Sequence, residues 1–190
     1  MVGGMSYFNR ITITEPTDAS TAAVEIIDYP HHEVHSGSHY FVKGYQDLSI
    51  NNVLQFTWQM PDTTKWIHWL WKVKTESETL IQVYEGGTIT TPLSAAVTPL
   101  NNDRNSTNTS GTTMRWETHA NLAAANGAVD VSAGLLMETG IIGAGRDSGS
   151  ENRDHETIMK QNTLYVMRAT ATAAGYINFD MAWYEHTNKA

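Results

Sequence analysis

The sequence predicts an all-β fold: an antiparallel β-sandwich of about eight strands with long polar loops, in the form of a jelly roll. Three observations favour this class. Short apolar runs alternate with polar residues at period two, Gly- and Pro-containing turns separate them, and no long helical pattern interrupts them. A chain of 190 residues suits one domain. We expect the sandwich to span residues 21–190, after an N-terminal arm or edge strand over residues 1–20.

The stretch from residue 62 to residue 85 is the expected centre of the core. Its first half holds three of the six tryptophans and places four apolar side chains on one face at period two: Ile67, Trp69, Trp71 and Val73. A polar turn at residues 75–78 leads into a second run rich in β-branched and aromatic residues. The pattern predicts a β-hairpin whose first strand is buried on one face and half-buried on the other.

A second hairpin is predicted at the C-terminal end, from strands over residues 164–172 and 176–185 joined by a turn at residues 173–175. The return strand alternates apolar and polar residues, which is typical of an antiparallel strand with one solvated face.

The remaining chain predicts shorter elements and two loops. Strands are expected at residues 22–29 (closed by Pro30), 40–42, within 47–60, near 88–90 and at 114–117, with one helical turn over 121–128 and a strand or short helix over 129–139. Residues 86–111 and 140–152 are expected to be polar loops, because few bulky apolar residues occur there.

Charge and composition exclude several classes of function. The chain has 12 Lys+Arg against 20 Asp+Glu, a net charge of −8, and no basic stripe, so we expect no nucleic-acid partner. It has no cysteine, no signal-peptide pattern and no run of about 18 apolar residues, so we expect no disulfide, no membrane partner and synthesis in a cytosol. The Asn-x-Ser/Thr sequences at Asn105 and Asn108 are interpreted as by-products of a polar loop.

Four histidines lie within nine positions: His31, His32, His35 and His39. In a helix, His31 and His35 would share a face, but Pro30 and the Ser-Gly-Ser at residues 36–38 disfavour a helix there. Three interpretations stay open: ordinary polar or interface residues, a metal site with Glu33, or a pH-sensitive contact.

Two groups of acidic residues and histidines have the composition of acid–base sites: Asp154, His155 and Glu156, and Asp180, Glu185 and His186. Such triplets also arise by chance. The chain contains no nucleophile elbow, P-loop or dinucleotide fingerprint. The sequence therefore predicts a protein that is not an enzyme and needs no cofactor.

Exposed aromatic residues offer a further choice. Trp66, Tyr84, Tyr176 and Tyr184 are either a platform for stacking sugars or part of the core or of a subunit interface. A contact loop is expected at Asn101, Asn102, Arg104 and Asn105.

Several motifs, in this order along the chain, resemble a group of tailed-bacteriophage structural proteins. They are Pro-His-His-Glu-Val-His-Ser-Gly-Ser-His-Tyr-Phe at residues 30–41, Pro-Asp-Thr-Thr-Lys-Trp at 61–66, Tyr-Glu-Gly at 84–86, Asn-Asn-Asp-Arg-Asn-Ser at 101–106 and Trp-Tyr-Glu-His-Thr at 183–187. They are spread over roughly residues 27–187, which is most of the chain.

The resemblance implies a virion decoration, or cement, protein: a β-sandwich on the outer capsid surface that bridges subunits of the major capsid protein and stabilises the shell. It also implies a homotrimer made in the host bacterial cytoplasm, and it transfers no catalytic residue. The alternative is a receptor- or glycan-binding module of a phage fibre.

Overall fold

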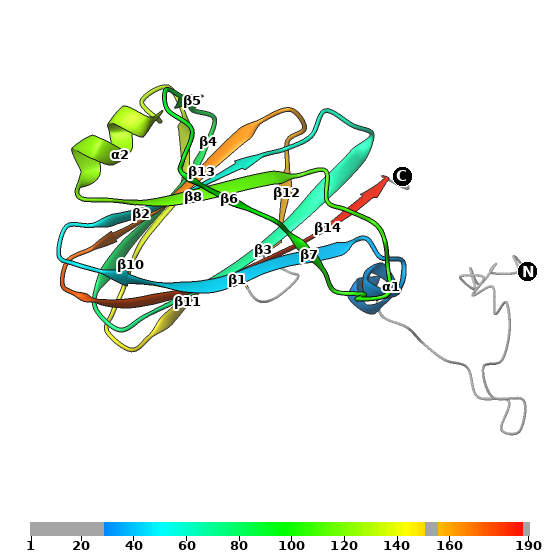
Figure 1. Ribbon diagram of the computed structural model, residues 1–190, viewed down its shortest axis with the longest axis horizontal. Helices are drawn as coiled ribbons and strands as arrows, with labels where there is room; N and C mark the ends of the chain where they lie inside the picture. Colours follow the sequence, from blue (N-terminus) through cyan, green and yellow to red (C-terminus); the bar gives the residue numbers. More distant parts are fainter. Residues whose placement is uncertain (1–28, 151–155, 188–190) are drawn as a thin grey trace, which may run out of the picture.

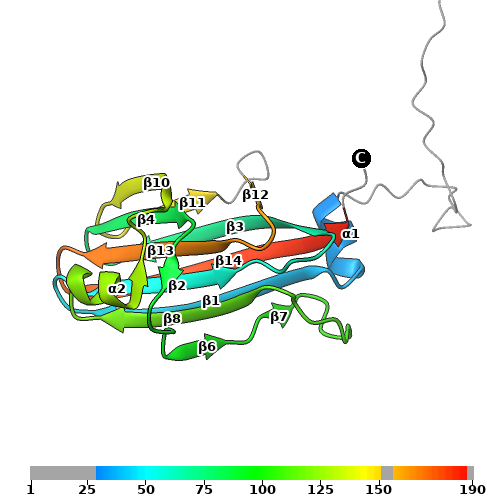
Figure 2. The same ribbon diagram turned by 90° about the horizontal axis from the view of Figure 1, so that it is seen from above.

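Two antiparallel sheets pack face to face in the computed structural model, which describes residues 29–150 and 156–187 (Figures 1 and 2). The first sheet has the order β11-β3-β14-β1-β7, with β12 also paired to β3; the second has the order β10-β4-β13-β2-β8-β6. The predicted antiparallel sandwich is confirmed. The expected arm at residues 1–20 and most of the expected strand at residues 22–29 lie outside the described residues.

The first sheet consists of β1 (His39–Leu48), β3 (Lys65–Thr75), β7 (Leu100–Asn101), β11 (Asp147–Ser150), β12 (Thr157–Met159) and β14 (Gly175–Thr187). The second sheet consists of β2 (Val53–Gln59), β4 (Thr79–Glu85), β6 (Ala95–Val97), β8 (Thr113–His119), β10 (Leu135–Ile142) and β13 (Leu164–Ala171). A small pair, β5 (Thr88–Ile89) with β9 (Val129–Asp130), and two helices, α1 (Tyr29–His35) and α2 (Leu122–Ala128), complete the described elements.

The two predicted hairpins are wrong in their pairing. Strands β3 and β4 follow one another but belong to different sheets, and so do β13 and β14. The connection therefore forms an arch over the core, not a hairpin within one sheet. Alternation along the sequence reports that each strand has an apolar face, but it does not report whether the next strand pairs beside it or packs opposite it.

Three arches lie at the same end of the sandwich, after β1, β3 and β13. Their backbones hydrogen-bond to one another: Asn51 N donates to Ala171 O at 2.8 Å, and Glu76 N donates to Tyr176 O at 2.9 Å. Because these turns satisfy each other's polar groups, the chain can cross from sheet to sheet without leaving buried backbone groups unpaired.

Aromatic side chains join the two sheets through the core. Phe56 of β2 meets Phe179 of β14 edge to face at 4.8 Å between ring centroids, and Trp58 of β2 meets Trp69 of β3 at 5.0 Å. Edge-to-face pairs add about 0.5–1.5 kcal/mol each beyond the area that they bury. The inward face predicted for the first half of residues 62–85 is confirmed, since its four apolar side chains are all buried.

The outer face of the second sheet is partly covered by α2 and by the β5–β9 pair (Figure 1). Under them lies a second apolar cluster of Leu93, Ala128, Val129, Val131, Leu164 and Val166. The predicted helical turn over residues 121–128 is confirmed as α2, where the Asn121 side chain caps the first turn by accepting from Ala124 N at 2.9 Å.

The expected loops contain more strand than the sequence indicated. Residues 86–111 include β5, β6 and β7, and residues 140–152 include the end of β10 and all of β11. These strands are two to four residues long, apart from β10; β6, β7 and β11 add to sheet edges, and β5 pairs with β9 in the small separate sheet. Small polar residues can pair there because an edge strand needs backbone hydrogen bonds more than an apolar face.

Gly44 leaves room for an aromatic ring of the core. A Cβ at this position would lie 2.6 Å from Cζ of Phe179, which is itself buried. We expect Gly44→Ala to lower the free energy of unfolding by about 1–3 kcal/mol, because the ring has to move within a filled core. Urea denaturation followed by tryptophan fluorescence measures this.

The matched control is Gly127→Ala, at a position in α2 where an added Cβ meets nothing within 4 Å. It should leave stability unchanged or raise it by up to about 1 kcal/mol, because alanine is a better helix former than glycine. Equal effects of the two substitutions would contradict the proposed packing.

Candidate functional site

Helix α1 corrects the prediction for the histidine-rich segment. Residues 29–35 are helical, although Pro30 and the Ser-Gly-Ser had disfavoured a helix. Pro30 occupies the first turn, where a missing N–H breaks no helical hydrogen bond. Gly37 then ends the helix with a φ of +68°, a conformation that glycine adopts readily.

The four predicted histidines separate into two places. Nε2 of His31 lies 2.8 Å from Nε2 of His35, one helical turn away, and His32 lies 3.5 Å from the buried carboxylate of Glu33. His39 instead starts β1 on the outer face of the first sheet. Within residues 29–150 and 156–187, no group of three or more His, Cys, Asp or Glu side chains could hold a metal ion.

A row of rings crosses the outer face of the first sheet at the end where α1 lies. His39 of β1 is paired with Tyr184 of β14, which is paired with His68 of β3. The Tyr184 ring stacks on the His68 ring at 4.5 Å and on the His39 ring at 6.4 Å. We call His39, His68, Glu156, Tyr184 and His186 the histidine face.

Within the histidine face, Glu156, His68 and His186 form a connected line. Nδ1 of His68 lies 2.8 Å from Glu156 Oε1, Nε2 of His68 lies 2.7 Å from Nε2 of His186, and Nδ1 of His186 lies 3.0 Å from the Thr187 carbonyl oxygen. The Tyr184 hydroxyl donates to the other oxygen of Glu156 at 2.6 Å.

The hydrogen-bond roles in this line depend on the tautomers of the two rings. The Thr187 carbonyl oxygen can only accept, so Nδ1 of His186 is the donor in that contact. The line therefore links Glu156 to the end of β14 through the rings of His68 and His186.

His39 is held neutral. Burial lowers the pKa of its imidazole below the ordinary value, Glu33 opposes that shift, and Lys43 adds to it. A neutral Nδ1 accepts a hydrogen bond, and the Asn102 side-chain nitrogen lies 2.6 Å away. This contact joins the expected histidine cluster to the expected contact loop.

The contact loop packs against the segment after α1. Nδ2 of Asn101, a buried side chain, donates to the Gly37 carbonyl oxygen at 2.8 Å. Asn102, Arg104 and Asn105 are exposed, although Arg104 donates to its own loop at the Asn101 carbonyl oxygen, 3.4 Å away. Of the four predicted contact residues, three therefore lie on the surface and Asn101 has a structural role.

A buried carboxylate fastens the end of this loop to β14. Glu185 accepts hydrogen bonds from Ser110 Oγ at 2.6 Å, Gly111 N at 3.0 Å and Thr112 N at 3.3 Å, and from the Trp183 indole N–H at 3.1 Å. Its side chain is almost completely buried. Glu185 is thus a structural anchor and not an exposed acid.

The two predicted acid–base triplets do not assemble as such. Asp154 and His155 lie outside the described residues, and Asp180 forms a surface ion pair with Lys43 at 2.7 Å. Only Glu156 and His186 come together, and they meet through His68. Sequence reasoning placed His68 merely on the half-buried side of its strand, since only the pairing of β3 with β14 brings it to Tyr184 and His186.

The four aromatic residues do not form one sugar platform. Tyr84 lies on the second sheet, while the other three lie on the first. Tyr184 is buried in the histidine face, and Tyr176 contacts Tyr45 near the arches at 6.2 Å. A continuous platform would need neighbouring rings on one face, so that interpretation is wrong for the set.

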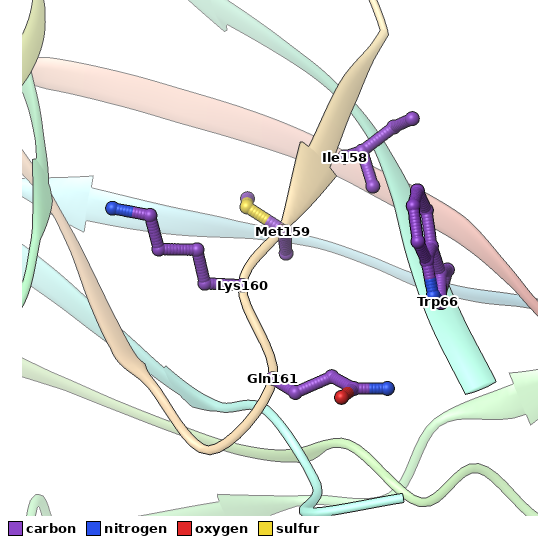
Figure 3. Close-up of a pocket in the computed structure, with 5 residues that line it drawn as sticks. All are labelled: Trp66, Ile158, Met159, Lys160 and Gln161. Carbon is purple, nitrogen blue, oxygen red and sulfur yellow. The ribbon is translucent and has the colours of Figure 1, made fainter. Parts of the chain in front are cut away.

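Trp66 instead borders a shallow pocket of about 290 Å³ (Figure 3). The Trp66 and Ile158 side chains lie beside one another, and Met159, the next residue of β12, is buried. The volume lies just below the roughly 300–1,000 Å³ of small-molecule sites. Lys160 and Gln161 complete the lining of this pocket.

Strand β10 has an open, apolar edge. It pairs with β4 on one side, and no described strand pairs with its other side. Four of its large apolar side chains are exposed, from Met137 at 39% to Ile141 at 68%, the others being Leu135 and Leu136. An unpaired apolar edge offers both backbone hydrogen bonds and apolar area to another chain.

No family model, no curated protein and no solved structure matches this chain. None of the helices in the described parts of the chain has the length and apolar character needed to cross a membrane. The function is therefore inferred from the residues of the chain itself.

Replacing Glu185 by glutamine tests the anchor. An amide nitrogen would face N–H donors in place of a carboxylate oxygen, so we expect the free energy of unfolding to fall by about 2 kcal/mol or more. The exposed pair formed by Asp180 supplies the control: Asp180→Asn should cost less than about 1 kcal/mol. Thermal denaturation of both variants measures the difference, and similar losses would refute the anchoring role.

Proposed function

We propose that this protein is a non-enzymatic decoration protein of a tailed bacteriophage, which binds the outer capsid surface and bridges neighbouring copies of the major capsid protein. The observation that carries the proposal is the open edge of β10. Monomeric soluble proteins usually blunt such edges with charged residues or proline, whereas β10 carries one charged residue, Glu138, among four exposed large apolar ones. We infer that another protein covers it.

The order of the strands supports a jelly roll as the form of the sandwich. Eight strands divide into the orders β1-β14-β3-β11 and β2-β13-β4-β10. Strands adjacent along the chain in these sets mostly lie in opposite sheets, as in a double-sheet fold built from two Greek keys. Jelly rolls occur in viral capsid and lectin domains, an association that supports the proposal without deciding it.

The proposed mechanism relies on many weak contacts. The pocket at Trp66 would accept one protruding side chain of the capsid protein, and β10 would add its edge to a capsid strand or lie against an apolar surface. A homotrimer would engage several capsid subunits at once, and effective concentration would then turn weak contacts into stable attachment. We therefore expect β10 to make the main contact with the capsid protein.

Capsid co-sedimentation tests the proposal. We expect the wild-type protein to bind expanded capsids of its own phage saturably, and Ile141→Asp to weaken binding at least about tenfold, because a buried unpaired carboxylate is costly at an interface. The matched control is Ile50→Asp, since Ile50 is similarly exposed, at 59% against 68%, but lies in the first arch. Circular dichroism confirms that both variants fold.

Absence of wild-type binding to capsids would overturn the decoration role. Equal binding by Ile141→Asp and wild type would overturn the assignment of β10 as the contact.

A further inference from the structure

A pocket of about 440 Å³ lies on the outer face of the second sheet, between α2 and the turn after β9. Its polar lining comes from Gln82 and Tyr84 of β4, Asn126 of α2, Asp130 of β9, Ser132 of the following turn, and Arg168 of β13. The volume falls within the roughly 300–1,000 Å³ of small-molecule sites. Leu122 and Val131 complete the lining, so the pocket combines several hydrogen-bonding groups with an apolar patch.

Arg168 is the fixed centre of the pocket, since its side chain is only 2% exposed. Nη1 donates to Asn126 Oδ1 at 2.7 Å, and Nη2 donates to the Val129 carbonyl oxygen at 2.8 Å. The orientation of the Gln55 amide that satisfies its neighbours places its oxygen 3.2 Å from both Nε and Nη2. The guanidinium also lies over the Tyr84 ring, 5.6 Å from its centroid.

The charge of Arg168 is balanced mainly by neutral groups. No carboxylate of the described residues lies within 4.0 Å of its nitrogens. Burial lowers the pKa of the guanidinium, which Tyr84 and the more distant Asp130 partly offset. A buried cation that is surrounded by dipoles attracts an approaching oxygen atom strongly, because the local dielectric is low.

Asp130 adds a negatively charged hydrogen-bond acceptor to the pocket. Its carboxylate is exposed, and Oδ1 accepts from Ser132 N at 2.8 Å, which fixes its direction. Backbone and side-chain hydrogen bonds from Ser132 lower its pKa, so it is ionised at neutral pH. The pocket therefore presents a strong acceptor at Asp130, the Asn126 side-chain nitrogen as a donor, and the Gln82 amide, which can donate and accept.

We propose that this pocket binds one pyranose ring of a carbohydrate. Each sugar hydroxyl both donates and accepts, so neighbouring hydroxyls can donate to Asp130 while they accept from the amide groups of Gln82 and Asn126. Leu122, which is 44% exposed, offers an apolar patch for the C–H face of the ring. A simple anion fits less well, because the Asp130 carboxylate would repel it.

The proposal of a carbohydrate site does not depend on the proposed capsid contact. Tyr84 contributes to this site because its ring lies against Arg168, and no platform of several aromatic rings is involved. The site would give a protein on a virion surface a means to hold glycans, and it would do so equally in a protein with another role.

Nuclear magnetic resonance titration of the full chain tests the proposal. The probes are methyl glycosides of glucose, galactose, mannose and N-acetylglucosamine, each added to about 50 mM, so that millimolar binding is detected. We expect at least one glycoside to shift the side-chain amide signals of Gln82 and Asn126. Asp130→Asn should weaken that binding at least about tenfold, because a charged acceptor is lost.

The matched control is Asp47→Asn, an exposed carboxylate on the first sheet, which should bind like wild type. Amide spectra of both variants show whether they keep the fold. The proposal is overturned if no glycoside shifts these signals, if the shifts map to another surface, or if Asp130→Asn binds as tightly as Asp47→Asn.

Discussion

The contact of two apolar strand faces across the core is the constraint on which the rest of this structure depends. Strands that follow one another, such as β3 and β4, both carry buried side chains on one face. They bury these faces by lying in opposite sheets of the sandwich, not by pairing side by side in one sheet. That arrangement requires the chain to arch between sheets. The arches in turn need polar turns that bond to one another, which the hydrogen bonds around Ala171 and Glu76 supply.

The fold class and most strand positions could be predicted because the alternation of apolar and polar residues depends only on neighbouring positions in the sequence. Pairing could not be, since β3 and β4 read like a hairpin whichever sheet each one joins. The helix at residues 29–35 was missed because Pro30 was weighed as a breaker when it stands in the first turn. For the candidate site, His39 and Asn102 were found by composition, but His68 joins Glu156 and His186 only through pairing between distant strands.

The surfaces of the protein differ in chemistry. The first sheet carries the histidine face, whose rings and Glu156 form a polar, hydrogen-bonded surface near α1. The second sheet ends in the apolar edge of β10 and carries the pocket at Arg168 on its outer face. Edge and pocket share β4, where Tyr84 is paired with Leu136, so a partner on β10 would lie next to a ligand in the pocket.

Amide hydrogen exchange of the protein, alone and bound to capsids, tests directly whether the open edge of β10 contacts the capsid. A bound strand gains partners for its outward N–H groups, so exchange there slows. We expect new protection within Leu135–Ile142 on capsids and little change in the arches. Unchanged exchange in β10, with new protection confined to another surface of the bound protein, would contradict this expectation.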